Sequence, residues 1–327
     1  MSTTESEREL ARPPYDIELG AVLTAMAEML PTSITPEMIV PARGQSFGPP
    51  IDEALVARGV DHEIRVIPGP VGEPDITVSI FSKRNRIAGG PGIYHIHGGG
   101  MILGDRMLGV EGLLDWIVDL DAVAVSVEYR LAPEHPDPAP VDDCYAGLVW
   151  MAEHADDLGF DANRLMVIGG SAGGGLSAGV VLKARDLCGP AIVGQVLECP
   201  MLDDRNQTVS SHQFVGTGTW DRNSNDTGWD AYLGDRRHTD SVSIYASPSR
   251  ATDLSGLPPT YIDCGSAEVF RDEDVAYATA IWAAGGICEL HVFAGGFHGW
   301  EGFAPQAALS AAARDSRDRW VRRLLSA

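Results

Sequence analysis

The sequence predicts an α/β fold, with a mostly parallel central β-sheet covered by helices on both faces. Two patterns support this: short apolar segments rich in β-branched residues recur along the chain, and helix-length segments lie between them. Such alternation of strand and helix is typical of βαβ units. The composition of the 327 residues, 44% hydrophobic and 21% charged, is that of a globular protein.

Eight segments are expected to form strands. The turn-rich stretch "PGPVGEP" separates the first two, which predicts an opening antiparallel hairpin. The others are apolar nearly throughout, as strands buried on both faces should be. The expected strands are residues 62–67, 75–82, 92–97, 121–130, 164–170, 192–200, 259–265 and 288–296.

Helices are expected at residues 107–119, 141–157, 172–187, 270–284 and 306–324. Two stretches interrupt this alternation of strands and helices. Residues 1–50 show helical spacing in "IELGAVLTAMAEML", and residues 201–257 form a long aromatic-containing interruption. Since long structureless loops are uncommon inside domains, we expect helices that cap the sheet edge. We therefore divide the chain into the amino-terminal part of a cap, 1–50, and a main domain, 51–327, in which 201–257 contributes to the cap.

The charge of the chain excludes some partners. Its 46 acidic and 24 basic residues give a formal net charge of −22, which repels nucleic acid and anionic membrane surfaces. The sequence contains no run of eighteen apolar residues, so no membrane-spanning helix is expected. The polar, acidic start "MSTTESEREL" is unlike a secretory signal, so a cytoplasmic protein is expected.

The cysteines indicate neither a disulfide framework nor a zinc site. There are five, widely spaced and without a C-x-x-C pair. Buried free thiols are the simplest interpretation, and this agrees with the expected cytoplasmic location.

Ser171 lies in "GGSAGG", between an expected strand and an expected helix. Gly169 and Gly173 complete a G-x-S-x-G pattern, in which a sharp turn exposes the hydroxyl and the following helix offers N–H groups to negative charge. A glycine-rich phosphate loop or a purely structural turn is the alternative. The stretch lacks both the dinucleotide-binding glycine spacing and the Walker lysine.

A serine nucleophile needs a base. In folds with this kind of serine turn the usual chain order is serine, then acid, then histidine, so the base comes last. His298 lies in the glycine-rich "AGGFHGW" directly after the last expected strand, which makes it the best candidate. His212 and His238 lie in the interruption, and His291 lies within a strand, where a structural histidine is ordinary.

The base in turn needs a carboxylate that orients it. Glu268 follows the penultimate strand, the position nearest the loop of the candidate base. Asp203 and Asp204 follow an earlier strand and remain the alternative; Asp263 lies within a strand. Residues 272–274 are expected to form the acidic first turn of the next helix.

Acyl transfer also needs N–H donors for the developing oxyanion. Residues 97–100, "HGGG", expose consecutive N–H groups after the third strand, and Ala172 supplies another beside the serine. His97 is expected to support the glycine loop by hydrogen bonding. His95 and His97 alternate on one strand and could instead ligate a metal, but no further ligand motif accompanies them, so no metal is expected.

Together these segments resemble the hormone-sensitive-lipase-like group of α/β-hydrolases, bacterial esterase family IV. The resemblance spans residues 60–303 and rests on "HGGG", "VEYRLAPEHPDPAPVDDC", "GGSAGG", "EVFRDE" and "FHGW". It implies the α/β-hydrolase fold with a helical cap over an acyl pocket. It also implies Ser171 as nucleophile, His298 as base, Gly99, Gly100 and Ala172 as oxyanion donors, and Gly98 as part of the supporting loop.

The chain departs from this group at three positions. Gly170 stands where an aspartate commonly precedes the serine, Glu268 stands where the acid is commonly aspartate, and Met101 replaces a common aromatic residue. The resulting hypothesis is a serine carboxylesterase for small-molecule esters with short to medium acyl chains, acting through an acyl-enzyme without a cofactor. An amidase or deacetylase is the alternative. A non-catalytic receptor is disfavoured because His298 is present, and the resemblance suggests a homodimer.

Overall fold

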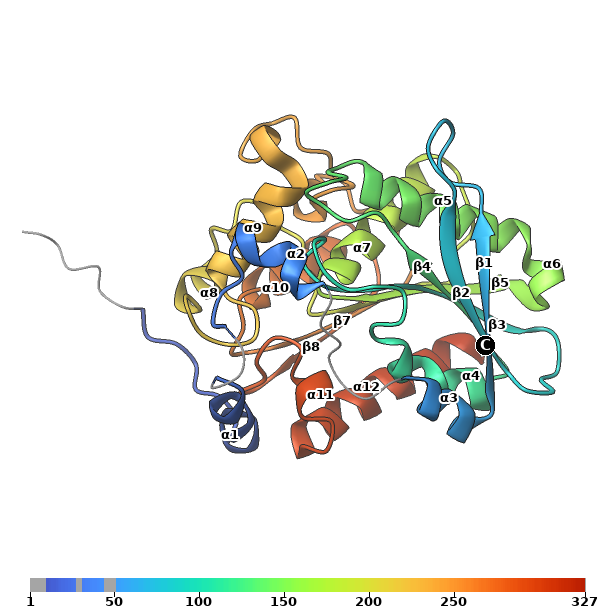
Figure 1. Ribbon diagram of the computed structural model, residues 1–327, viewed down its shortest axis with the longest axis horizontal. Helices are drawn as coiled ribbons and strands as arrows, with labels where there is room; N and C mark the ends of the chain where they lie inside the picture. The colour runs from blue at the N-terminus through green and yellow to red at the C-terminus, as the bar shows by residue number, and fades with distance from the viewer. Residues whose placement is uncertain (1–9, 28–30, 44–50, 327) are drawn as a thin grey trace, which may run out of the picture.

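The computed structural model describes residues 10–27, 31–43 and 51–326, and an eight-stranded sheet forms its centre (Figure 1). The strand order is β1-β2-β4-β3-β5-β6-β7-β8. β2 runs antiparallel to both of its neighbours, and the other pairs of adjacent strands are parallel. The opening hairpin and the mostly parallel sheet predicted from the sequence are therefore confirmed.

Each expected strand is present, with changes mainly at its ends. The strand expected to reach residue 200 stops at Glu198, because Cys199 adopts a left-handed backbone with φ of 38°. The strands are β1 (Val60–Ile67), β2 (Ile76–Lys83), β3 (Gly90–Ile96), β4 (Val123–Glu128), β5 (Phe160–Gly170), β6 (Gly194–Glu198), β7 (Thr260–Gly265) and β8 (Cys288–Phe293).

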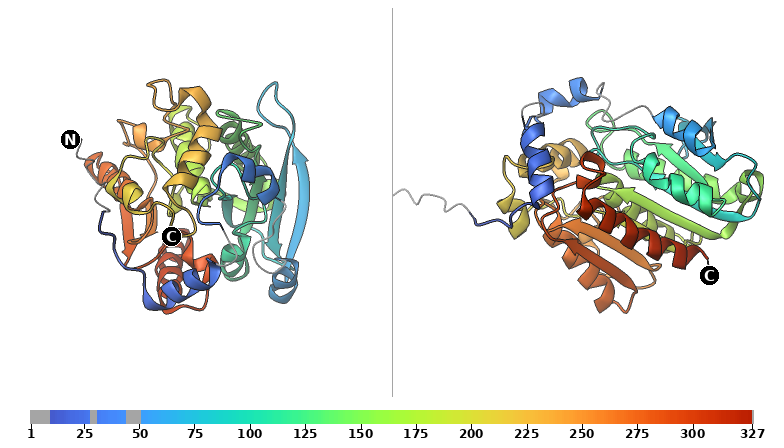
Figure 2. Two further views of the ribbon diagram at one scale, coloured as in Figure 1. Left: turned by 60° about the vertical axis from the view of Figure 1, so that its left-hand side comes forward. Right: turned by 90° about the horizontal axis from the view of Figure 1, so that it is seen from below.

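Helices cover both faces of the sheet, as predicted. One face carries α5 (Ala139–Glu153), α7 (Ala172–Asp186) and α10 (Arg271–Ala283). The other carries α3 (Ile51–Arg58), α4 (Leu114–Asp119) and α12 (Ala308–Leu325), and Figure 2 shows α12 lying along the underside of the sheet. A separate short helix, α6 (Ala155–Leu158), follows α5 within the segment expected to be one helix. None of the helices in the described ranges combines the length and apolarity needed to cross a bilayer.

The segment before the sheet divides into two parts. Helix α1 (Ile17–Met26) packs beside the chain that follows β8, where Leu19 is buried in a cluster with Phe297 and Trp300. Residues 31–43, with α2 (Ile39–Ala42), instead adjoin the long interruption: the N–H of Ile34 donates to Ser224 Oγ at 2.9 Å. Residues 1–9, 28–30 and 44–50 of the expected cap lie outside the described residues.

The interruption between β6 and β7 contains helices, as the sequence suggested. They are α8 (Val209–Gln213) and α9 (Arg222–Leu233), and Figure 1 shows them grouped with α2 at one end of the molecule. Trp229 and Tyr232 of α9 are fully buried there. This end of the molecule also holds the serine loop and the histidine loop.

Candidate active site

Ser171 occupies a strained turn between β5 and α7. Its φ of 56° and ψ of −123° lie outside the regions that non-glycine residues favour. The turn leaves no room for side chains nearby: a Cβ on Gly169 would lie 2.3 Å from the carbonyl oxygen of Gly173, and one on Gly173 would lie 2.1 Å from that of Ile96. The Ser171 N–H donates to the Glu198 carbonyl oxygen at 2.7 Å, which anchors the turn to β6.

The structure brings Ser171, His298 and Glu268 together from three remote segments. His298 Nε2 lies 2.9 Å from Ser171 Oγ in hydrogen-bonding contact. Glu268 Oε2 accepts from His298 Nδ1 at 2.7 Å, and Glu268 Oε1 accepts from the Gly265 N–H at 2.7 Å. Glu268 is 2% exposed and His298 9%, so the histidine–carboxylate pair is shielded from water.

The other histidines considered as the base lie elsewhere. His212 and His238 are exposed. His291 lies on β8, where its Nε2 is 3.1 Å from Glu289 Oε1 and 3.2 Å from Ser316 Oγ. General-base catalysis requires a serine at one ring nitrogen and a carboxylate at the other. Glu289 and Ser316 both contact Nε2 of His291, so this cluster lacks that arrangement.

The other candidate acids bind arginines. Asp203 binds Arg205 through both oxygens, and Asp204 binds Arg250 in the same way. Asp263 pairs with Arg317. These carboxylates neutralise arginines, whereas Glu268 accepts from the imidazole.

The glycine loop after β3 lies directly beside the serine turn. A Cβ on Gly98 would be 3.4 Å from Ser171 Cβ. Within the described part of the chain, no hydrogen bond engages the N–H groups of Gly99, Gly100 or Ala172. These three donors are therefore free to bind an oxygen atom of a ligand at the serine.

His97 packs beneath this loop. Its Nδ1 is 2.8 Å from the Gly98 carbonyl oxygen, its ring stacks on Tyr129 at 4.1 Å, and the Tyr129 hydroxyl donates to the His97 carbonyl. Burial lowers the pKa of His97, and it lowers that of His95 to about 3. Both rings are therefore neutral near pH 7, and His95 is held by Ser126 Oγ at 2.8 Å.

Among the residues that the structure describes, two clusters place possible metal-ligand atoms within 4.8 Å of one another. They are Cys199 with Glu268 and His298, and Cys264 with Glu268 and Asp274. In both, the Glu268 oxygens already accept hydrogen bonds from Gly265 and His298. A metal would have to displace the contacts that orient the imidazole, so the residues fit the hydrogen-bonded arrangement better than a metal site.

Two residues of the interruption complete the site and were not identified as site residues from the sequence. The Thr219 hydroxyl donates to the His298 carbonyl oxygen. Trp220, 8% exposed, packs its ring against Gly100. Trp220 is one of the aromatic residues of the interruption, for which the sequence left pocket lining and cap core as equal alternatives; no local pattern marks Thr219.

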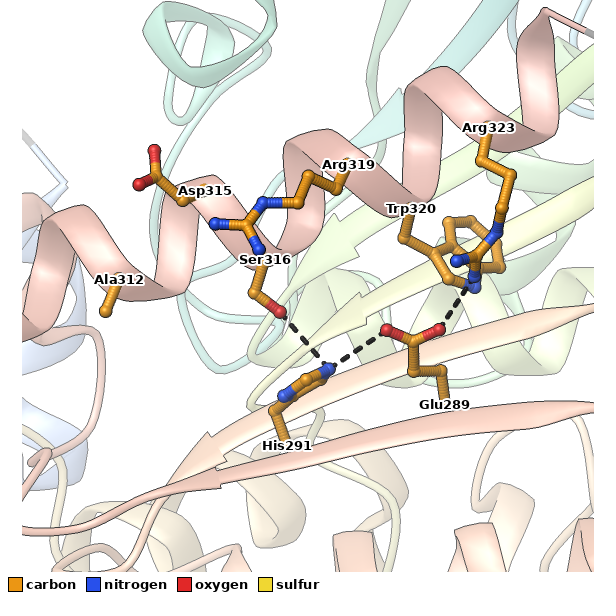
Figure 3. A pocket seen from close by; sticks show the side chains of 8 residues that line it. All are labelled: Glu289, His291, Ala312, Asp315, Ser316, Arg319, Trp320 and Arg323. Carbon is orange, nitrogen blue, oxygen red and sulfur yellow. Dashed lines mark hydrogen bonds and ion pairs between the residues drawn. The ribbon is translucent and has the colours of Figure 1, made fainter.

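A separate cavity of about 430 Å³ lies between β8 and α12 (Figure 3). It is lined by Glu289, His291, Ala312, Asp315, Ser316, Arg319, Trp320 and Arg323. No residue predicted for the site lines it. Ser316 and Arg323 of α12 reach His291 and Glu289 of β8 across it.

Comparisons with known proteins agree with this architecture. A family described as "alpha/beta hydrolase fold" matches residues 93–302. Esterase LipI of Mycobacterium tuberculosis is 35% identical over 257 residues, 76% of this chain and 79% of LipI. Carboxylesterase NlhH of the same organism is 37% identical over 216 residues, 65% of this chain and 67% of NlhH.

Solved structures resemble the whole chain. The structure titled "Bacterial Heroin Esterase" superposes with a TM-score of 0.86 at 39% identity, covering 95% of this chain and 98% of that one. The likeness therefore extends over nearly the whole chain.

Proposed function

Since the chain belongs to the α/β-hydrolase family, in its hormone-sensitive-lipase-like group, and is a carboxylic ester hydrolase, we propose that it cleaves esters with short to medium acyl chains through Ser171. One observation carries the proposal: an unbroken line of hydrogen bonds runs from Ser171 Oγ through the His298 ring to Glu268. This arrangement can remove a proton from the hydroxyl as it attacks a carbonyl carbon.

In the first step Ser171 Oγ attacks the ester carbonyl while His298 Nε2 takes the hydroxyl proton. The carbonyl oxygen becomes negative and is bound by the N–H groups of Gly99, Gly100 and Ala172. Glu268 stabilises the imidazolium and holds its ring in place. The imidazolium then returns the proton to the leaving alcohol, which yields the alcohol and an acyl-enzyme.

In the second step water replaces the alcohol. His298 takes a proton from the water, which attacks the acyl carbon, and the same three N–H groups bind the second oxyanion. Collapse of this intermediate returns the proton to Ser171 Oγ and releases the carboxylic acid. His97 and Gly98 support the donor loop, and no cofactor takes part in any step.

The wall beside the oxyanion loop supports the preference for shorter acyl chains. Trp220 fills the space next to Gly100, Gly228 of α9 lies against the same ring, and Met201 lies beside Gly228. A bulky, nearly buried ring at this place limits the length of any acyl group that extends toward it.

An active-site probe tests the assignment. A fluorophosphonate, which reacts with activated serines, should add one phosphonyl group to the protein, and peptide mass spectrometry should locate it on Ser171. Ser171→Ala should lose this adduct and about 10⁶-fold in kcat while keeping its fold by circular dichroism. An adduct on another residue, or an active Ser171→Ala variant, would refute the proposal. Matched esters and amides then separate an esterase from an amidase.

We further propose that the protein is cytoplasmic and forms a homodimer. The five cysteines are free thiols, which suits a reducing compartment. β8 is the outermost strand of the sheet, so a single chain leaves one of its edges unpaired. Light scattering coupled to size exclusion tests the dimer.

A further inference from the structure

A second carboxyl group lies directly behind Glu268. Asp274, in the first turn of α10, is fully buried, and neither of its oxygens has a hydrogen-bond partner among the described residues. One oxygen of Asp274, one of Glu268 and Cys264 Sγ lie within 4.8 Å of one another. The sequence predicted an acidic first turn of a helix here; that turn is present, and its Glu273 and Asp274 are buried.

The two carboxyl groups differ in their donors. Glu268 accepts from the Gly265 N–H and from His298, which stabilise its negative charge. Asp274 has no donor of this kind. Because two neighbouring buried carboxylates resist simultaneous ionisation, the group without N–H donors keeps the proton.

The other acids around Asp274 act in the same direction. Glu273 of α10 and Asp263 of β7 are acids whose charge raises the pKa of Asp274, whereas the nearby Cys264 thiol, a weak donor, lowers it. Cys199 after β6 is a further buried thiol. Burial, followed by the charge of Glu268, raises the pKa of Asp274 well above its ordinary value. The positive end of α10 favours ionisation, but this effect is smaller than the cost of a second buried charge.

We propose that Asp274 is a protonated residue that positions Glu268. It stays neutral beside Glu268, so that the two carboxyl groups together carry one negative charge. Its hydroxyl hydrogen is directed to the Glu268 carboxylate. The role rests on the proposed function, because it acts through Glu268 on His298. A second charge here would bind the imidazolium too firmly for His298 to act as a base at neutral pH.

Infrared spectroscopy tests the proton directly. A buried protonated carboxylic acid has a carbonyl stretch that carboxylates and amides lack. The difference spectrum of wild type minus Asp274→Asn at neutral pH should contain this band. The difference spectrum of wild type minus Asp272→Asn should not, because Asp272 accepts from Ser210 N–H and from Arg271. Absence of the band from the first spectrum would overturn the proposal.

The pH profile of kcat/KM tests the positioning role. Asp274→Asn keeps a neutral donor, so its activity should stay within about threefold of wild type and its acid limb should not move. Asp274→Leu has no donor; the Glu268 carboxylate then holds the imidazolium proton more firmly. We expect kcat to fall about tenfold with KM nearly unchanged, the effect of losing one hydrogen bond to a charged group, and the acid limb to move to higher pH.

Two results of the kinetic test would contradict the proposal. An acid limb that moves to lower pH in Asp274→Asn would mean that Asp274 is ionised in the wild type. Equal profiles for Asp274→Leu and Asp274→Asn would mean that its hydroxyl has no role. Asp274→Ala replaces the leucine variant if that variant does not fold. If the wild type cleaves no ester, the proposed function fails, while the infrared result still decides the protonation of Asp274.

Discussion

Gly100 and Trp220 lie so close that Gly100 has no room for a side chain: a Cβ there would be 2.3 Å from Trp220 Cη2. Gly228 of α9 also lies against this ring, since a Cβ added to Gly228 would be 3.4 Å from Trp220 Cζ2. The indole is thus held between the oxyanion loop and α9. Its position gives a residue of the interruption direct influence over what fits beside the proposed oxyanion donors.

We expect Trp220→Ala to shift the acyl preference toward longer chains. Removing the ring opens space next to Gly100, so esters with acyl chains longer than the wild-type optimum should gain at least about tenfold in kcat/KM relative to acetyl esters, the effect of accommodating one or two further methylene groups. A series of p-nitrophenyl esters of increasing chain length measures this. Trp229→Phe is the matched control, because Trp229 is a second buried tryptophan of this region and its ring packs beside Tyr232. Parallel changes in both variants would indicate general loosening of this region and not a wall formed by Trp220.

Glu268→Gln should lower kcat by about 10³ to 10⁴-fold, because a glutamine cannot stabilise the imidazolium and its amide can favour the wrong ring tautomer. Asp203→Asn and Asp204→Asn should each cost less than about tenfold, since these carboxylates bind Arg205 and Arg250 and not His298. Steady-state kinetics on one chromogenic ester compares the three variants. The opposite ranking would assign the acid to the loop after β6.

Asp221 joins the interruption to the amino-terminal segment, and its loss should destabilise the protein. The fully buried carboxylate accepts from Ser224 N–H, Ser224 Oγ, Gly216 N–H and Ser33 Oγ, at 2.6 to 2.9 Å. Asp221→Ala should reduce the free energy of unfolding by about 3 kcal/mol, because it removes an N-cap and leaves buried donors unpaired. Urea denaturation measures this loss. Ser33→Ala removes one of these bonds and should cost about 1 kcal/mol; an equal loss in both variants would show that Asp221 is not the anchor.

The sequence was sufficient for the sheet and for the order of the site residues. Strands buried on both faces have an apolar pattern that turns interrupt, and in a parallel sheet the carboxyl ends of neighbouring strands meet at one edge. The meeting of Ser171 after β5, Glu268 after β7 and His298 after β8 could therefore be predicted from the sequence.

Contacts between side chains of distant segments could not be predicted in the same way. Thr219 reaches the His298 carbonyl only because the interruption folds back over the histidine loop. Asp274 looks in sequence like any acidic helix start, and its burial depends on the rotation of α10 about its axis. The sequence showed the glycine at position 170, but it could not show which residue lies opposite. In the structure β5 pairs with β6 so that Gly170 lies opposite Glu198.

A buried arginine gathers carboxylates beneath the serine turn. Arg317 of α12 binds Glu198 Oε1 at 2.9 Å and Asp263 Oδ2 at 2.9 Å, and it also binds Glu301. Glu198 is the residue whose carbonyl accepts from the Ser171 N–H. Burial raises the pKa of Glu198 to about 7, although the charge of Arg317 acts in the opposite direction.

This raised pKa predicts a stability that depends on pH. Between about pH 4.5 and pH 7 the folded protein holds a proton on Glu198 that the unfolded chain has lost, so this group makes the wild type less stable as pH rises through that window. Glu198→Gln does not titrate, so its free energy of unfolding relative to wild type should increase between about pH 5 and about pH 8. The full shift corresponds to about 3 kcal/mol, and partial solvent exposure reduces the expected change to about 1 to 2 kcal/mol. Urea denaturation at several pH values measures the difference. Glu134→Gln is the control, because Arg43 holds the pKa of Glu134 below its usual range and no such increase should occur. A difference between Glu198→Gln and wild type that stays constant with pH would show that Glu198 is already ionised at the acid end of this window.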